Sequence, residues 1–272
     1  MSVGIWTFAF DTRPIGEVVE AAREIEELGF ESIWCGEYRG REAFTQAGLL
    51  LAATEKLTVA TGIARFGERT PLAAAAAGRT LAEAHPGRFV LGLGGHLPGD
   101  RPLRRFTEYL DGMDNAGLIS PAAPYRRVLA ALGPRMLELA ASRTDGAHSY
   151  FVPPEHTAIA REAVGPKGYL VVEQSVVLDP DPASARQAAR EFVGQYVGMA
   201  AHHRANLRRL GFTDDDLTEV SDRLVSAIVA SGEQAVHDRI RAHLDAGADH
   251  VCVQVISDGL PRAEWRVLAD LV

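Results

Sequence analysis

The sequence is poor in cysteine, in lysine and in long apolar runs. Its two cysteines, Cys35 and Cys252, each lie inside an apolar run and form neither a CxxC pair nor a zinc pattern, so they are typical of small core residues. Of the 28 lysine and arginine residues only Lys56 and Lys167 are lysines, and neither stands in a GxxxxGK[ST] phosphate loop. No apolar run approaches the roughly 20 residues of a membrane span.

The chain also lacks an excess of positive charge. Its net charge is -8 and its pI about 5.6, so nothing indicates a nucleic-acid partner. The hydrophobic and charged fractions, 47% and 24%, are typical of a soluble globular protein. Residues 1–5 lack the basic segment and cleavage site of a signal peptide. We therefore expect a cytoplasmic protein without a membrane partner.

Several catalytic signatures are missing. The chain holds no GxSxG nucleophile elbow and no HExxH zinc motif. His202 and His203 are adjacent in a helical stretch, where neighbouring side chains point apart, so a metal site there is not favoured. Gly92, Gly94 and Gly95 resemble a dinucleotide fingerprint, but Leu97 replaces its last glycine and no helix follows directly. We reject that motif and expect no metal.

What is present is organised around residues 88–96, RFVLGLGGH. The short apolar run from Phe89 is bounded by Pro-Gly pairs, which is typical of a buried parallel strand. Gly94 and Gly95 stand at its carboxyl end, where glycine lets a flat ligand approach the backbone. Because ligands of βα proteins bind at the carboxyl ends of strands, His96 is a candidate catalytic residue. A glycine turn followed by a surface histidine is the alternative.

Apolar runs and helical patterns alternate along the whole chain. Eight strands separated by helices, in a chain of this length, predict a (β/α)8 barrel in a single domain, residues 1–272. Extra helices between the seventh and eighth strands, residues 183–246, are predicted to be an insertion. A doubly wound open sheet is the alternative, but the first turn, residues 9–13, has no glycine. The predicted strands are 3–8, 32–35, 57–63, 89–93, 127–132, 147–152, 169–178 and 250–256.

Two turns after strands could bind an anion. Gly133-Pro134-Arg135 opens a helix, and the free N–H groups of a helix start attract phosphate. Residues 152–157, VPPEHT, open a second helix in the same way. Two ordinary connections are the simpler interpretation. Glu37 ends the second strand, while Glu173 lies inside the seventh and could be either a buried ion-pair partner or a site residue. Trp6, near a strand end, could serve the core or a cofactor.

Several segments together resemble the bacterial luciferase-like monooxygenase superfamily. More narrowly, they resemble its actinobacterial branch of oxidoreductases that use coenzyme F420. The similarity extends over essentially the whole chain, and the order and spacing of the segments are more specific than any one of them. The segments are TGIA (61–64), LAEAHPGRFVLGLGG (81–95), LAALGPRMLELA (129–140), DGAH (145–148), LRRLGFT (207–213), SDRL (221–224) and AGADHV (246–251).

The resemblance implies a deazaflavin or flavin at the carboxyl ends of the strands. It implies a cis peptide bond at Gly62-Ile63 against the ring, with His96 near the ring's reactive edge and Glu37 as a further candidate catalytic contact. It implies that the backbone of the fifth and sixth strand ends holds the ribityl chain and phosphate. The cofactor-binding residues expected on these grounds are Trp6, Gly62, Ile63, Gly94, Gly95, Ala131, Gly133, Gly146, Val152 and His156.

Three functions follow from these observations. The first is an F420-dependent oxidoreductase that transfers a hydride between the deazaflavin and a small organic substrate. The others are an FMN-dependent luciferase-like monooxygenase and a member that binds a ligand without turnover. Arg65 and Arg69, after the third strand, are the nearest candidates for contacting the acidic 8-hydroxyl of the deazaflavin. We also expect a homodimer, because barrels of this superfamily usually pair and the helix predicted at 71–84 is rich in alanine.

Overall fold

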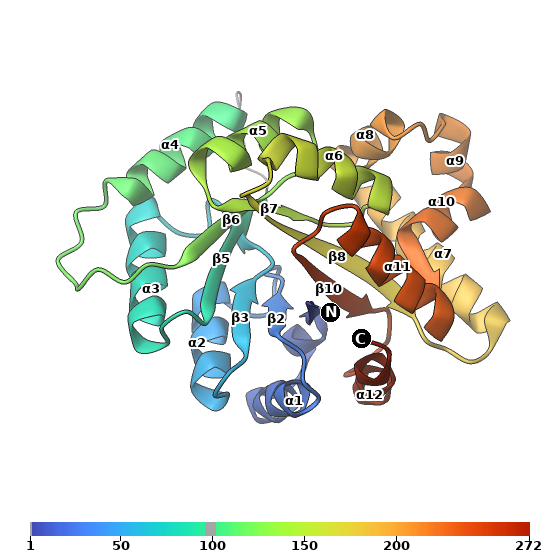
Figure 1. Cartoon of the computed structure of the whole chain (residues 1–272), viewed down its shortest axis with the longest axis horizontal. Coiled ribbons are helices and arrows are strands. Elements are labelled where there is room, and N and C mark those ends of the chain that lie inside the picture. The colour runs from blue at the N-terminus through green and yellow to red at the C-terminus, as the bar shows by residue number, and fades with distance from the viewer. Residues whose placement is uncertain (1, 96–101) are drawn as a thin grey trace.

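The chain folds into a closed parallel barrel surrounded by helices (Figure 1). The structure is a computed structural model and describes residues 2–95 and 102–272. Strand β10 pairs in parallel with both β1 and β8, and this double pairing closes the sheet. The predicted (β/α)8 barrel is confirmed and the open sheet is excluded. The barrel strands are β1 (Val3–Thr7), β2 (Ser32–Cys35), β3 (Thr58–Thr61), β5 (Phe89–Gly94), β6 (Arg126–Ala130), β7 (Gly146–Ser149), β8 (Tyr169–Val177) and β10 (His250–Val255).

Two short strands lie outside the barrel order. β4 (Ala64–Arg65) pairs with β5 and continues the course of β3 after the Gly62-Ile63 bond. β9 (Val229–Ser231) pairs with β8 at the end of the insertion. The sequence did not predict β4 or β9, because two or three residues are too few to show a periodic pattern.

The helices cover the outer face of the barrel. Proline stands in the first turn of α3, α5, α6 and α7, where its missing N–H costs no hydrogen bond. The helices are α1 (Ile15–Glu27), α2 (Ala43–Ala53), α3 (Pro71–Ala84), α4 (Pro102–Asp114), α5 (Pro134–Arg143), α6 (Pro154–Val164), α7 (Pro182–Met199), α8 (Ala201–Arg209), α9 (Asp214–Glu219), α10 (Asp222–Ile228), α11 (Glu233–Asp245) and α12 (Arg262–Leu271), with a 3₁₀ helix at Ala9–Thr12.

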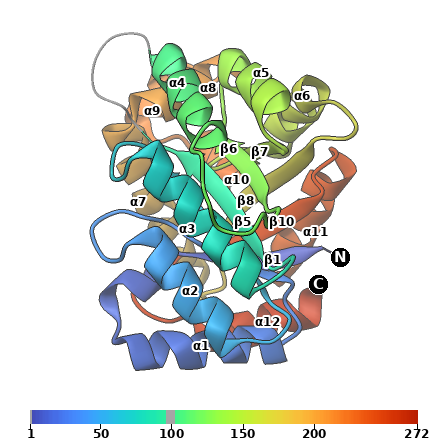
Figure 2. The ribbon, with the colours of Figure 1, turned by 90° about the vertical axis from the view of Figure 1, so that its left-hand side faces the viewer.

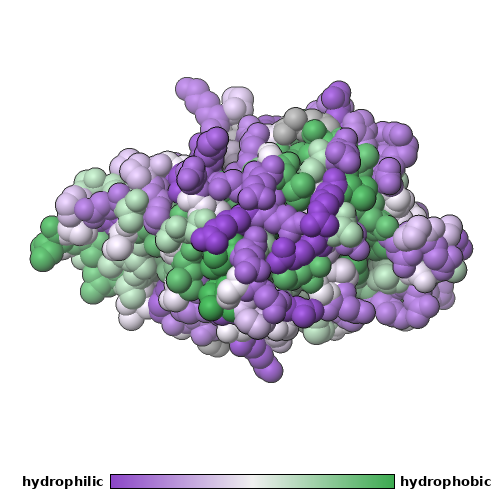
Figure 3. All heavy atoms as spheres, turned by 90° about the horizontal axis from the view of Figure 1, so that it is seen from below, coloured by the Kyte–Doolittle hydropathy of each residue, from purple (hydrophilic) through white to green (hydrophobic). Residues whose placement is uncertain are grey.

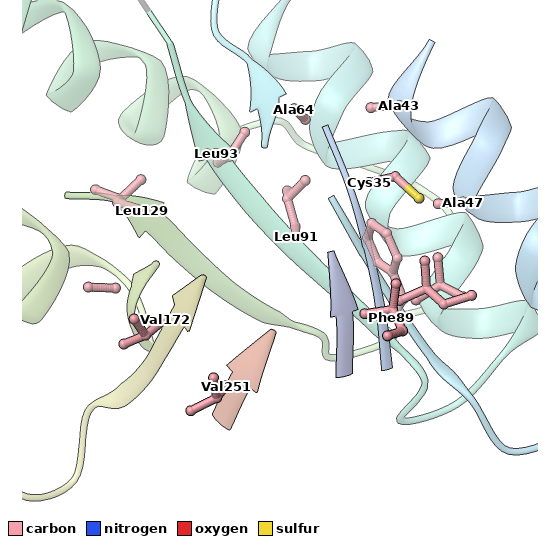
Figure 4. Packing of buried hydrophobic residues seen from close by; sticks show 14 of the residues in the cluster. Cys35, Ala43, Ala47, Ala64, Phe89, Leu91, Leu93, Leu129, Val172 and Val251 are labelled. Atoms are coloured by element: carbon pink, nitrogen blue, oxygen red, sulfur yellow. The ribbon is translucent and has the colours of Figure 1, made fainter. Parts of the chain in front are cut away.

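Successive side chains of each strand point alternately out of the barrel and into it, so the buried apolar side chains form two layers. Outward-facing residues pack against the helices, and Figure 4 shows Cys35 at the end of β2 next to Ala47 of α2. Inward-facing residues fill the barrel itself, among them Trp6, Trp34 and Cys252. Both cysteines are buried in these layers, as their apolar context predicted. Because side chains alternate with a period of two, Glu173 and Gln254 also face the barrel axis.

The predicted insertion is confirmed. Helices α7 to α10 gather at one end of the barrel (Figure 1) and share an apolar cluster of their own with Phe151 and Val177. Figure 2 shows α1 and α12 near each other, and Glu24 of α1 ion-pairs with Arg262 and Arg266 of α12. The first and last helices are therefore joined by charge as well as by the β1–β10 pairing.

One face of the surface is shown in Figure 3. Hydrophilic side chains cross this face and divide its apolar areas into separate patches. Within residues 2–95 and 102–272, no helix combines the length and the apolar character needed to cross a membrane. The predicted homodimer stays a prediction.

Candidate functional site

All barrel strands run in parallel, so their carboxyl ends meet at one rim, where barrel enzymes place their sites. Trp6 lies one residue before the end of β1, and Gly62 follows β3 directly. Gly94 ends β5 on the same rim. The structure therefore brings together residues that are far apart in the sequence.

Trp6 and the Gly62-Ile63 bond form one corner of the rim. The bond is cis, as predicted. A Cβ at Gly62 would lie 2.5 Å from Nε1 of Trp6, so only glycine leaves room for the indole. Trp6 is buried, yet its Nε1 has no hydrogen-bond partner among the described residues. A buried N–H donor without a partner is uncommon in proteins and indicates a water or ligand acceptor at this point.

Gly94 and Gly95, at the carboxyl end of β5, are glycines for two different structural reasons. A Cβ at Gly94 would lie 2.6 Å from the Cβ of Ala130 and 3.2 Å from the side chain of Ile63, so glycine there allows the strands to approach closely. Gly95 adopts a φ of +97°, which favours glycine, and it is exposed. His96 lies outside the described residues. Contacts of Gly94, Gly95 and His96 with a ring stay predictions.

Glu37 is held at the start of the β2–α2 loop. Its carboxylate accepts hydrogen bonds from the backbone N–H of Arg65 at 2.7 Å and of Ala43 at 3.1 Å, and it ion-pairs with Arg69. The Glu37 and Arg69 side chains are 7% and 11% exposed, so the pair is shielded from solvent. The carboxylate thus fastens α2 to the segment after β4. A catalytic role of Glu37 stays a prediction. Arg69 is already ion-paired with the Glu37 carboxylate.

A cavity of about 420 Å³ lies at the start of α5. Gly133 is the N-cap residue and Pro134 occupies the first turn, as predicted from the sequence. Arg209 of α8 also lines the cavity, and a Cβ at Gly133 would lie 3.3 Å from its guanidinium. A helix N-terminus beside a guanidinium favours an anion. Leu103, Phe106, Arg135 and Met136 complete the lining.

His156 and Asn206 contact this region, His156 through the carbonyl of Leu132 and Asn206 through Arg209. His156 donates from Nε2 to the carbonyl of Leu132 at 2.9 Å, so its Nδ1 carries a lone pair, and this atom has no partner among the described residues. Burial lowers the pKa of His156 below its ordinary value. The nearby Arg209 lowers it as well, while the hydrogen bond to the Leu132 carbonyl acts in the opposite direction. Asn206 accepts from Arg209 at 3.1 Å through Oδ1, while its buried Nδ2 has no partner in the described parts.

Three further predicted residues differ in their position. Ala131 and Val152 are buried near the carboxyl ends of β6 and β7. Gly146, by contrast, begins β7, and a Cβ there would lie 1.9 Å from the carbonyl oxygen of Tyr169. This glycine allows the close approach of β8 at the end opposite the rim. The structure does not bring Gly146 together with the other predicted cofactor contacts.

Sequence reasoning missed a hydrogen-bonded group on the rim. The hydroxyl of Tyr150, just after β7, donates to Oε1 of Gln254 at 2.7 Å and lies 2.5 Å from the hydroxyl of Tyr196 on α7. The rings of Tyr150 and Trp6 are 4.8 Å apart. Inward alternation from Cys252 could have indicated Gln254, whereas nothing in the helical pattern of α7 distinguishes Tyr196.

Glu173 lies below this group, inside the barrel. Its carboxylate accepts from the Ser175 hydroxyl at 2.5 Å and from the backbone N–H of Phe151 at 3.0 Å. No lysine or arginine of the described residues pairs with it, so the ion-pair alternative is not observed. Burial raises the pKa of Glu173 to about 7. Phe151 adopts a φ of +60°, which is uncommon for a bulky residue, and this hydrogen bond helps to hold it.

A second cavity, of about 600 Å³, lies at the opposite mouth of the barrel. Its lining comes from strand starts, including Ser32, Tyr169 and His250. His250 contacts the Ser32 hydroxyl at 2.6 Å and the Ser2 hydroxyl at 2.8 Å, and the Trp34 indole donates to Ser32 at 3.0 Å. These polar groups satisfy one another, which is typical of the stabilising end of such barrels. The described residues contain no cluster that could hold a metal ion.

Comparisons with known proteins agree with this geometry. Residues 1–116 match the family model described as luciferase-like monooxygenase. A Mycobacterium tuberculosis protein named "putative coenzyme F420-dependent oxidoreductase" is 24% identical over 94% of this chain and 91% of its own length.

Solved structures resemble the chain over its whole length. One, with a TM-score of 0.78 and 17% identity, is an F420-dependent secondary alcohol dehydrogenase in complex with an F420-acetone adduct, and the match covers 100% of this chain and 98% of that one. Another, with a TM-score of 0.73 and 14% identity, is the FMN-bound oxygenating constituent of a Pseudomonas putida diketocamphane monooxygenase, covering 100% and 97%. At these identities the structural likeness shows the fold alone. The match of residues 1–116 to this family model, the similarity to the curated relative and the shared fold agree with the resemblance to the luciferase-like monooxygenase superfamily that the sequence predicted.

Proposed function

We propose that this protein is an F420-dependent oxidoreductase that acts on a small organic substrate. The observation that carries the proposal is a set of buried polar atoms without partners among the described residues: Nε1 of Trp6 at the strand-end rim, and Nδ1 of His156 and Nδ2 of Asn206, whose side chains contact Leu132 and Arg209 at the start of α5. The similarity to the Mycobacterium tuberculosis protein named "putative coenzyme F420-dependent oxidoreductase" supports the choice of cofactor. When bound, the deazaflavin supplies hydride chemistry, and the protein binds and orients the reactants and excludes water.

The ring end of the cofactor would be held at Trp6. Its Nε1 offers a hydrogen-bond donor in a buried position at the carboxyl end of β1. An acceptor atom on a heterocyclic ring would satisfy this donor, whose loss to burial otherwise costs about 1–3 kcal/mol. Ile63 and Gly94 border the same corner of the rim. These residues fit a planar ring with acceptor atoms at its edge.

The other end of the cofactor would be held at α5. A phosphate fits the first turn of this helix and the Arg209 guanidinium. Nδ1 of His156 is an acceptor and Nδ2 of Asn206 is a donor, and hydroxyl groups can satisfy both. A ribityl chain followed by a phosphate has this chemistry. Because F420 and FMN share it, these residues support a cofactor of this class without choosing between the two.

FMN is the second candidate, favoured by the FMN-bound structure of the same fold. The choice rests on groups that recognise the 8-hydroxyl of the deazaflavin. Arg65 pairs with the exposed Glu68 and is 33% exposed, whereas Arg69 is occupied by Glu37 and Glu42. We propose Arg65 as the cation that faces this hydroxyl.

The cofactor site is tested by binding with variants of α8. Arg209→Gln should weaken F420 binding at least tenfold, because it removes a charge-assisted contact with the phosphate. Arg208→Gln is the matched control, since Arg208 is on the same helix, is exposed and pairs with Asp214. Fluorescence titration measures both. Equal affinities of the two variants would contradict the placement of the phosphate at α5.

A further inference from the structure

Tyr150, Tyr196 and Gln254 form a hydrogen-bonded chain with a fixed direction. The Tyr150 hydroxyl has one hydrogen, and it donates this to Oε1 of Gln254. The Tyr196 hydroxyl, 2.5 Å away, must therefore donate to the oxygen of Tyr150. Because Oε1 is occupied, the Gln254 amide presents its NH₂ group on the other side. Within residues 2–95 and 102–272 this nitrogen has no hydrogen-bond partner.

The hydrogen-bonded chain of Tyr196, Tyr150 and Gln254 lies on the rim that would hold the cofactor. Tyr150 follows the last residue of β7, and Gln254 lies one residue before the end of β10. The Tyr150 ring is 4.8 Å from the ring of Trp6, the residue proposed for the cofactor ring. Tyr150 and Tyr196 are partly exposed and Gln254 is 9% exposed, so this group is largely buried but still accessible to solvent.

The surroundings of the hydrogen-bonded chain are aromatic on the tyrosine side, and the buried Glu173 carboxyl acts electrostatically on both tyrosines. The rings of Phe151 and Tyr196 stack at 5.0 Å, and the ring of His203 lies 5.7 Å from that of Tyr196. Burial lowers the pKa of His203 to about 3, so this histidine is neutral near pH 7. No lysine or arginine of the described residues contacts Tyr150, Tyr196 or Gln254 through a hydrogen bond or ion pair. An anionic group placed here would lose its hydration without gaining a cation.

We propose that the Gln254 amide, oriented by Tyr196 and Tyr150, binds the carbonyl oxygen of a neutral organic substrate. An N–H donor at the end of a chain of hydrogen bonds is polarised by the links behind it, which strengthens its contact with an acceptor. The inference rests on the proposed function for the identity of the reaction, while the binding of the carbonyl compound rests on the chain alone. Since Tyr196 belongs to α7, the insertion also contributes to substrate choice.

The test is a ligand-observed NMR titration of the cofactor-free protein with two probes of similar size. Cyclohexanone carries a neutral carbonyl and cyclohexanecarboxylate carries an anion. We expect the ketone to bind at least tenfold more tightly, because the site supplies an N–H donor and no cation. Gln254→Glu should weaken ketone binding about tenfold, since Tyr150 can still donate to the new carboxylate while the N–H is lost. Tyr196→Phe should weaken it about threefold by removing the first link of the chain.

Gln195→Glu is the matched control, because Gln195 is exposed on α7 beside Tyr196, and its ketone affinity should equal that of the wild type. Gln254→Met removes the donor without adding charge, and circular dichroism confirms folding of each variant. Unchanged ketone binding in folded Gln254→Glu and Gln254→Met would overturn the proposal, as would tighter binding of the carboxylate. F420 titration runs in parallel. If ketone binding depends on Gln254 but the protein does not bind F420, the role of Gln254 is supported and the proposed function is refuted.

Discussion

Replacing Glu173 by glutamine should change how the stability of the protein depends on pH. Glu173 is 1% exposed, and burial raises its pKa from the ordinary value of 4.5 to about 7. The folded protein therefore binds a proton that the unfolded chain has released. The free energy of unfolding falls as the pH rises from about 4.5 to about 7, and the contribution is constant above that range.

The magnitude follows from the difference between the two pKa values. A rise in the pKa from 4.5 to about 7 corresponds, at about 1.36 kcal/mol for each pKa unit, to about 3 kcal/mol of stability lost between pH 4.5 and pH 8. Glutamine keeps the shape and can accept from the Phe151 N–H, but it never carries the charge. The advantage of Glu173→Gln over the wild type should therefore grow by about 3 kcal/mol across this range.

The assay is urea unfolding, followed by circular dichroism at pH 5 and at pH 8. The comparison uses the difference between variant and wild type because buried histidines also titrate. Burial lowers the pKa of His148 and His250 to about 4, so their contribution has the opposite sign and is lost as the pH falls below about 6.5. This contribution cancels in the difference. Glu162→Gln, at an exposed position on α6, is the control. Parallel pH profiles for Glu173→Gln and the wild type would refute the reasoning.

Other predictions concern the cofactor, the reaction and the assembly. Trp6→Phe keeps an aromatic ring but removes the unpartnered N–H, so cofactor affinity should fall about fivefold, as measured by fluorescence titration; an unchanged affinity would mean that the ring does not contact Nε1. His96→Ala should lower turnover more than cofactor affinity, and an unchanged turnover number would contradict a role as proton donor. Sedimentation should show a homodimer, and a species of 29.3 kDa at micromolar concentration would exclude it.

The barrel could be predicted from the sequence because short, largely apolar runs alternate with segments of helical periodicity along the whole chain. The run from Phe89 to Leu93 contains no polar residue, so its burial on both sides was evident. Strand β9 could not be predicted, because its three residues continue the helical pattern of α10 and become a strand only by pairing with β8. Tertiary pairing decided this segment, and local propensity did not.

The candidate site was predicted in part. The end of the first strand indicated Trp6, and the family resemblance implied Gly62; the parallel strands bring both residues to one rim. Gly133 followed from its position before a helix. The family resemblance also implies a cofactor contact at Gly146, but Gly146 begins its strand, and the register with Tyr169 explains its glycine. Hydrogen bonds join Tyr150 to Tyr196, 46 positions away, and to Gln254, 104 positions away, and no local sequence pattern predicts such contacts.

The proposed function depends most directly on the identity of the cofactor. A side-by-side fluorescence titration of the purified protein with F420 and FMN measures it. We expect F420 to bind at least tenfold more tightly than FMN, a difference of about 1.4 kcal/mol. Equal or tighter binding of FMN would contradict the assignment to F420.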